Sequence, residues 1–508
     1  MKRINLIYIL EIITVVLVAT GILPRAIVPY MTVALAFYFI FAPLDEVSLF
    51  FVRSIPLFIA IPLTAGFDSL NMWRIFSIII FLKWLNLENI RSFFNFNRRR
   101  KVYLTLLGLL ALAILSVIGA ASVSLALKRI IFFINASLIG IVIYDLAAKV
   151  PNYSKKLIRN IAIPVILVSI AGFIQLATTY IFSLDQFINF WGNVVERNLF
   201  GNAWADIALK ANTWFAYFGE QISLRMFSIF PDSHSFPIFL ILGLPAILAI
   251  SLDKIVAAGK GLKSMFLTRG RMMVLFVPLA FLGVILSGTR GMWLAGFGAI
   301  LLYFALIWVF GHKLSAFSYQ LSVFKYIGSY LSVFVILFSI AYPVMGSPQF
   351  NMFNLSGGLL GTRIKSIIDI GETSNARRIQ IWKDSLKSII HHPILGVGIS
   401  NFPVVVGEDL AKVKAGSSAH NLYLHIASEM GIPALLLALY FLWLLLQKIY
   451  FNFRDENDSI RLIYFSASLI FIPWILMYLF TDIAIFDERA LLMFVITCAL
   501  IFGIKKEA

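Results

Sequence analysis

The chain contains little charge and a single cysteine. Charged residues make up 13% of its 508 residues, whereas apolar residues make up 60% and phenylalanine alone occurs 47 times. A soluble chain of this length carries about twice that charged fraction. Cys498 lies inside an apolar run, so the chain has neither a disulfide framework nor a thiolate metal site. The composition argues against a large soluble protein and predicts that most of the chain lies in lipid.

The common metal-binding spacings are also missing. The sequence offers no HExxH motif, no DxD-type motif and no Cys/His cluster that would make a strong metal site. We therefore predict that the chain binds no metal and uses no cofactor.

Long apolar runs dominate the chain instead. About fourteen stretches have close to 18 or more residues with few or no charges, enough to cross the ~30 Å hydrocarbon core of a bilayer. They lie at 5–23, 26–43, 47–65, 72–87, 102–121, 130–148, 160–181, 236–252, 272–288, 292–310, 329–346, 431–449, 460–480 and 488–504. The stretches at 47–65 and 72–87 are the weakest and could be partly re-entrant. The pattern predicts an all-α polytopic membrane protein with about 12–14 transmembrane helices.

The placement of basic residues predicts the orientation of these helices. The formal net charge is +17, and lysines and arginines gather in three short loops, near 91–101, 149–159 and 254–271. If Lys2 and Arg3 are cytoplasmic, alternation of the spans puts all three loops and the C-terminal tail in the cytoplasm. We expect a multi-pass protein with both termini cytoplasmic. A charge excess distributed in this way is a membrane-orientation signal, so no nucleic-acid partner is predicted.

Two further loops, both on the outer side by this count, are too long to be simple connections. They divide the chain into transmembrane parts at 1–181, 236–346 and 431–508 and outer loops at 182–235 and 347–430. The second loop contains a helical pattern in which Ile379, Trp382, Leu386 and Ile390 share one face, and Pro393 ends it. We expect an amphipathic helix in the outer interface that could form a lid or wall over a site.

Residues with useful chemistry collect at the ends of these outer segments. His420 and Asn421 lie where the second loop returns to apolar sequence, Arg225 lies near the end of the first loop, and Arg290 lies in the short turn Ser287–Gly291. Imidazole titrates near neutral pH, and guanidinium matches phosphate oxygens in a bidentate fork. Arginines that converge at an outer membrane face would suit a pyrophosphate on a lipid carrier. Simpler roles stay open, because Arg290 could extend to lipid headgroups and His420 could merely begin a helix.

Several motifs in this chain resemble those of one protein family. The stretches Ala376–Trp382, His392–Phe402, His420–Leu424 and Glu429–Pro433 together closely resemble the conserved region of the O-antigen ligase family. Its superfamily also contains O-antigen polymerases and bacterial protein O-oligosaccharyltransferases. The turn Ser287–Gly291 and the segment after Arg225 resemble further motifs of that family. The second of these departs from the family pattern, because this chain reads Phe-Pro-Asp-Ser-His at 230–234.

The resemblance implies a GT-C-like fold and transfer of a glycan from undecaprenyl diphosphate at the outer face of the bacterial inner membrane. Carried over by motif, Arg225 and Arg290 would bind the diphosphate and His420 would activate the acceptor hydroxyl. The reaction would be metal-independent, with inversion at the anomeric carbon. Supporting roles would fall to Asp232, His234, Arg377, Arg378 and Asn421.

Two alternatives stay open from the sequence. A polymerase of the same superfamily differs only in the acceptor, which is another lipid-linked repeat rather than a separate lipid, glycan or protein. A polysaccharide or lipid transporter, or flippase, belongs to a different class. Transporters tend to place ionisable residues near the bilayer midplane, whereas here they gather at the outer rim.

Overall fold

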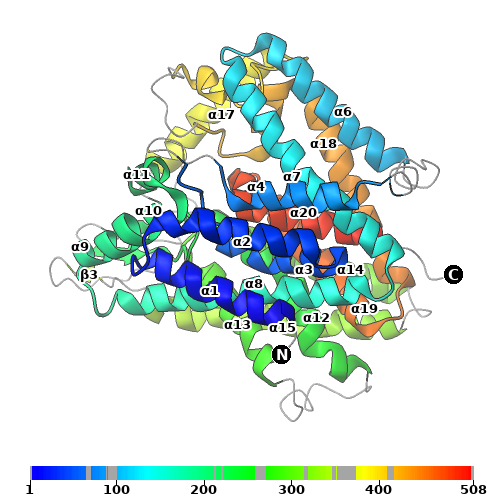
Figure 1. Cartoon of the computed structure of the whole chain (residues 1–508). Helices are drawn as coiled ribbons and strands as arrows, with labels where there is room; N and C mark the ends of the chain where they lie inside the picture. Colours follow the sequence, from blue (N-terminus) through cyan, green and yellow to red (C-terminus); the bar gives the residue numbers. More distant parts are fainter. Residues whose placement is uncertain are drawn as a thin grey trace.

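The fold is a bundle of long helices, seen in a computed structural model of the chain (Figure 1). The structure describes residues 3–63, 70–86, 89, 100–210, 213–218, 221–257, 271–313, 318–345, 350–351, 373–408 and 417–504. Within these residues eight helices are long and apolar enough to cross a membrane. The prediction of an all-α polytopic membrane protein is confirmed.

A helix overlaps each of the predicted spans. The first part of the chain forms α1 (Arg3–Ala19), α2 (Val28–Phe41), α3 (Leu44–Ser54), α4 (Met72–Trp84), α6 (Arg100–Ser116), α7 (Val123–Lys149) and α8 (Tyr153–Thr178). The second part forms α12 (Ser235–Ala257), α13 (Arg271–Leu286), α14 (Arg290–Lys313), α15 (Ser318–Met345), α18 (Leu422–Asp455), α19 (Ser459–Tyr478) and α20 (Glu488–Gly503). The two weakest spans correspond to short helices, and α3 continues into an extended segment in which Ala60 bridges to Asn71.

The two long loops contain their own secondary structure and meet at one end of the bundle. They hold α9 (Leu184–Phe187), a π-helical segment (Ile188–Glu196), α10 (Arg197–Phe200), α11 (Asn202–Lys210), β1 (Phe215–Phe218), β2 (Gln221–Leu224), β3 (Phe350–Asn351) and α17 (Thr373–His391). Strand β2 pairs with β1 and with β3, both antiparallel, with Phe215 opposite Leu224 and Ile222 opposite Phe350. Because β3 belongs to the second loop, this small sheet ties the two loops together.

Helix α12 forms the centre of the bundle. It packs against α8, α13, α19 and α20, and almost all of its membrane-spanning window is buried. The crossing with α8 is close because Gly243 has no side chain, and a Cβ there would lie 2.0 Å from Val165. Small residues allow such close approach where helices cannot gain from leaving water. The loop just before α12 is thereby held on the most enclosed element of the fold.

Helix α18 is kinked, and the chain that follows α17 crosses the kink. Gly431 has a φ of +84°, which interrupts the helix. The amide N–H groups of Val397 and Gly398 donate to the carbonyls of Ser428 and Glu429 at 2.9 and 3.0 Å. In return, the Ile432 N–H donates to the Pro393 carbonyl at 2.8 Å. The crossing therefore satisfies backbone groups that the kink would otherwise leave without partners.

Helices α6 and α7 diverge from a shared turn. Helix α6 packs along α18, whereas α7 packs against α20 and α4. The turn itself holds the segment that crosses the kink, because Ser116 Oγ accepts from the Ile399 N–H at 3.2 Å and Asn401 Oδ1 accepts from the Ser122 N–H at 2.7 Å. In Figure 1 this turn and α17 lie together at the top of the view.

We expect Gly431→Ala to destabilise the protein far more than Gly407→Ala. Both glycines have positive φ, but a Cβ at Gly431 would lie 2.1 Å from the Ile394 carbonyl oxygen, whereas a Cβ at Gly407 meets nothing within 4 Å. Backbone strain alone costs about 1–2 kcal/mol, and the clash should add about 1–3 kcal/mol. Thermal melting of the detergent-solubilised variants measures the difference. Equal melting temperatures for the two variants would show that the close crossing at Gly431 does not limit which side chains the position tolerates.

Candidate active site

Four chain segments meet beside the small sheet. They are the stretch between β2 and α12, the α13–α14 turn, the segment before α18 and the α19–α20 turn. Backbone hydrogen bonds fix this assembly: Met226 N–H donates to the Leu286 carbonyl at 2.9 Å, and Leu422 N–H donates to the Leu479 carbonyl at 2.8 Å. The segments are distant in sequence, so only the tertiary fold brings their side chains together.

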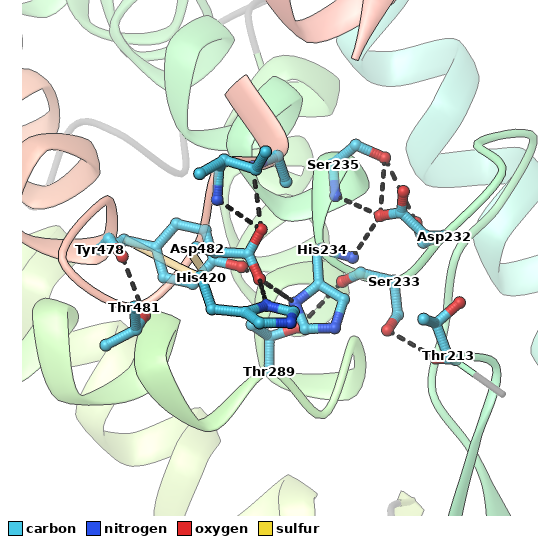
Figure 2. Close-up of polar contacts among 12 residues, drawn as sticks. Thr213, Asp232, Ser233, His234, Ser235, Thr289, His420, Tyr478, Thr481 and Asp482 are labelled. Carbon is cyan, nitrogen blue, oxygen red and sulfur yellow. Dashed lines mark hydrogen bonds and ion pairs between the residues drawn. The ribbon is translucent and has the colours of Figure 1, made fainter. Parts of the chain in front are cut away.

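The Asp482 carboxylate lies at the centre of this junction. Its Oδ1 accepts from the backbone N–H groups of Ile483 and Ala484 at 2.8 and 2.9 Å. Its Oδ2 lies 3.1 Å from His234 Nδ1 and 3.9 Å from His420 Nδ1 (Figure 2). Burial by itself raises the pKa of the Asp482 carboxyl, but the charges and side-chain interactions of the two histidines outweigh it and hold this pKa well below its usual range. The carboxylate is therefore ionised at neutral pH.

His234 uses both of its ring nitrogens within the protein. Its Nε2 lies 3.4 Å from an Arg225 Nη2 atom, and guanidinium can only donate, so Nε2 must be the acceptor. The neutral ring then carries its proton on Nδ1, which lies 3.1 Å from both Asp482 Oδ2 and the Tyr478 hydroxyl. This tautomer, assigned from the network, leaves His234 without a free lone pair.

His420 is arranged differently. Its Nδ1 is buried and faces Asp482, yet the side chain as a whole is 40% exposed, so the exposed part of the ring is the edge that carries Nε2. Its backbone has a φ of +44°, which is unusual for a residue with a side chain. Neighbouring contacts hold this conformation, because Trp382 Nε1 donates to the Ala419 carbonyl at 2.9 Å and Asn421 caps α18. Of the two histidines on Asp482, His420 is the one that presents a nitrogen outward.

Arg225 and the Arg290 turn border the same junction. Arg225 is half-buried, and its Nε and Nη2 lie 3.4 Å from the Ser287 carbonyl and 3.5 Å from Thr289 Oγ1. Arg290 is the first residue of α14 and is also half-buried. Its neighbour Gly291 lies against the α19–α20 turn, where a Cβ would lie 2.2 Å from Thr481 Oγ1. The fold thus brings Arg225, His420 and the turn that carries Arg290 to one place.

One comparison with known proteins covers part of this junction. Residues 275–439 match the family model described as O-antigen ligase. Over this region the chain is similar to O-antigen ligases. No curated protein matches the chain. The family resemblance predicted from the motifs is confirmed, and it implies a glycosyltransferase-like enzyme.

The matched O-antigen ligase region contains only part of the junction. Arg290 and His420 lie inside residues 275–439, whereas Arg225, His234 and Asp482 lie outside. The candidate site therefore includes segments from both sides of the matched region.

Several predicted supporting residues turn out to have structural contacts. Asp232 Oδ1 accepts from the His234 and Ser235 N–H groups at 2.8 and 2.7 Å, at the start of α12. Asn421 Oδ1 accepts from the Tyr423 and Leu424 N–H groups at 3.0 and 3.1 Å, at the start of α18. Asn421 is the N-cap of α18, and Asp232 holds the turn that leads into α12, so each positions the histidine near it.

The two arginines at the start of α17 have different surroundings. Arg377 is exposed, whereas Arg378 is half-buried and close enough for its charge to act on Tyr478. The Tyr478 hydroxyl in turn contacts His234. Only Arg378 is thus connected to the junction.

Sequence reasoning missed Asp482 and Tyr478. Asp482 lies in a short turn between two apolar spans, as Arg290 does, and that shared position was the available signal.

Across the described part of the chain, no group of three or more His, Cys, Asp or Glu side chains is arranged to hold a metal ion.

Opposite effects of pH are expected for Asp482→Asn and Asp487→Asn. The pKa of Asp482 is lowered in the folded protein, so its ionised form stabilises the fold above about pH 4 and this contribution is lost as pH falls further. Burial raises the pKa of Asp487 to about 7, with a smaller contribution from Asp232, so its ionisation costs stability as pH rises toward that value.

Near neutral pH, Asp482→Asn should therefore lower the free energy of unfolding by about 1–3 kcal/mol, because a buried hydrogen-bonded charge is lost. The melting temperature should fall accordingly. Asp487→Asn should raise the melting temperature at about pH 8, and this difference should disappear at about pH 4, whereas the Asp482→Asn difference should shrink only below about pH 4. Melting curves from about pH 8 to below about pH 4 provide the measurement. A drop that is independent of pH in Asp482→Asn would show that the carboxylate charge has no role in stability.

Proposed function

We propose that this protein transfers an oligo- or polysaccharide from undecaprenyl diphosphate to an acceptor hydroxyl at the outer face of a bacterial inner membrane. The observation that carries the proposal is the orientation of His420. Its Nδ1 faces a buried carboxylate while its opposite edge is exposed, at the ends of membrane-spanning helices, and Arg225 is connected to the same carboxylate through His234. A base, an orienting carboxylate and fixed positive charge are what such a transfer requires.

In the proposed reaction the acceptor hydroxyl attacks the anomeric carbon of the donor. His420 Nε2 takes the hydroxyl proton, a new bond forms between the acceptor oxygen and the anomeric carbon, and the bond to the diphosphate oxygen breaks. The diphosphate leaves with the electron pair. A single displacement of this kind inverts the anomeric configuration. General-base assistance of this type is worth about 10²–10⁴-fold in rate.

Asp482 stabilises the imidazolium that forms on His420. The 3.9 Å separation between Asp482 Oδ2 and His420 Nδ1 is longer than a hydrogen bond, and protonation of the ring would strengthen the attraction. Contacts between catalytic groups are often long before substrate binds. The carboxylate itself stays ionised, because its low pKa makes it a poor proton acceptor.

Arg225 and Arg290 neutralise the leaving diphosphate. The Arg225 guanidinium contacts Ser287, Thr289 and His234, so its orientation is set before substrate binds. Preorganised donors stabilise charge that develops in the transition state without reorganising during the reaction. We expect these guanidinium groups to supply the charge without a bound metal.

The principal test is complementation of a deletion strain with His420→Gln and His234→Gln. We expect His420→Gln to abolish transfer, because its exposed nitrogen is the base. We expect His234→Gln to retain a reduced activity, about one-tenth of wild type, because an amide can still bridge Arg225 and Asp482. Glycan analysis of the cell envelope measures transfer, and immunoblotting of membranes controls for expression.

Each outcome in the deletion strain separates the candidate functions. Accumulated undecaprenyl-linked polymer indicates a ligase, whereas single transferred repeats without long chains indicate a polymerase of the same superfamily. Unchanged glycans with a missing transported solute indicate a transporter. Full transfer activity in the His420→Gln strain would remove this residue from the chemistry.

Arg290→Lys should lose most of its transfer activity. Lysine keeps the positive charge but cannot offer the planar fork that binds two phosphate oxygens together. A loss of about tenfold or more in kcat/KM is expected for one charge-assisted hydrogen bond. Transfer from the lipid-linked donor in proteoliposomes measures it, with Arg377→Lys on the exposed surface as the matched control. Near-wild-type activity of Arg290→Lys would assign this residue to lipid headgroups instead.

A further inference from the structure

Arg129, on α7, lies near the site, and within the described residues aromatic rings rather than hydrogen-bond acceptors surround its guanidinium. Its guanidinium stacks on three aromatic rings, with its central carbon 5.5 Å from the centre of Phe132, 5.8 Å from Phe133 and 5.8 Å from Phe486. Phe486 belongs to the same turn as Asp482. Arginine on such rings keeps its in-plane N–H donors available for an anion.

No partner in the described part of the chain holds this guanidinium by a hydrogen bond or an ion pair. The two acidic residues whose charge acts on Arg129 are already engaged elsewhere. Glu429 contacts His425 at 3.5 Å and accepts from the Phe402 N–H at 3.1 Å. Glu488 pairs with Arg74 at 3.3 Å and accepts from Trp73 Nε1 at 2.8 Å.

The position of Arg129 makes this lack of a partner informative. Arg129 lies seven residues after Ser122, which caps α7, and therefore about 10 Å along a membrane-spanning helix. A charged residue inside such a helix is costly unless it meets an opposite charge, so it marks a functional site by default. Side chains lean toward the helix N-terminus, which brings the guanidinium closer to the level of lipid headgroups.

Arg129 is carried by a different element from Arg225. Arg225 reaches Asp482 through His234, on the segments around β2 and α12. Arg129 comes from α7 and contacts Phe486, and its charge and that of His420 both act on His425. The divergence of α6 and α7 leaves α7 packed on α4 and α20 rather than on its hairpin partner.

From this arrangement we propose that Arg129 binds a phosphate group of a lipid-borne acceptor, while Arg225 and Arg290 bind the donor diphosphate. The proposal rests on the transfer reaction proposed above. It assigns the two substrates to two arginine sites that different elements of the chain supply. A phosphorylated glycolipid acceptor would place its phosphate on Arg129 and its hydroxyl near His420.

Equilibrium binding to the full-length protein in neutral detergent tests this assignment. The probes are a bisphosphorylated diglucosamine glycolipid, the same glycolipid without phosphates, and undecaprenyl diphosphate. Wild type should prefer the phosphorylated glycolipid by about tenfold or more, the value of one charge-assisted bond. Arg129→Gln should lose this preference and keep its affinity for undecaprenyl diphosphate.

Lys128→Gln is the matched control, because Lys128 is exposed on the same helix. It should change neither affinity. If Arg129→Gln does not purify as a folded protein, Arg129→Lys takes its place, and a preference several-fold smaller than in wild type is expected because the fork is lost.

Four results would overturn the assignment. They are no preference in wild type, an unchanged preference in the Arg129 variant, a loss of undecaprenyl diphosphate affinity in that variant, and abolition of the wild-type preference by equimolar phosphatidylglycerol. The last result would assign Arg129 to headgroups of bulk lipid. Failure of wild type to bind undecaprenyl diphosphate would count against the proposed function alone. The acceptor site is tested separately, by comparing the affinities for the phosphorylated and unphosphorylated glycolipids.

Discussion

The site depends on one buried carboxylate that is shared by two imidazoles. A carboxylate removed from water is costly unless its charge is paired and its oxygens are hydrogen-bonded. Asp482 meets this requirement with two backbone N–H groups of its own turn and with His234 and His420 from two other segments. The same interactions therefore hold the carboxylate charge, set the tautomer of the neutral His234 ring and fix the relative positions of three loops. The interactions of Asp482 thus determine both the proposed chemistry of the site and the arrangement of the loops that form it.

The glycine-containing motifs act on the backbone rather than on a substrate. Gly396 and Gly431 allow two segments to cross at a distance that a side chain would prevent, and the crossing satisfies the backbone groups of the α18 kink. Next to this crossing, Trp382 holds the residue before His420. The motifs that resemble the O-antigen ligase family thus contribute backbone contacts around the α18 kink and beside His420.

Arginines near the junction differ in how their charge is balanced. Arg225 is fixed by contacts with Ser287, Thr289 and His234, which suits the repeated binding of one charged group in one position. Arg129 is supported by aromatic rings and makes no charged hydrogen bond within the described residues. The first environment favours transition-state stabilisation, whereas the second favours the binding and release of an anion that arrives from the lipid phase.

The sequence by itself determined the membrane class, the positions of the helices, the family resemblance and most of the candidate residues. These follow from local properties, because the free energy of placing a segment in lipid is a sum over about 18 neighbouring residues. Only the tertiary structure decided which side chains act together. It placed Asp482 between two histidines and showed that Asp232 and Asn421 hydrogen-bond backbone N–H groups at the starts of helices. It also showed that His420 has an exposed ring nitrogen, whereas both ring nitrogens of His234 contact other side chains. The reason is that ion pairs and hydrogen bonds depend on distances between residues that lie far apart along the chain.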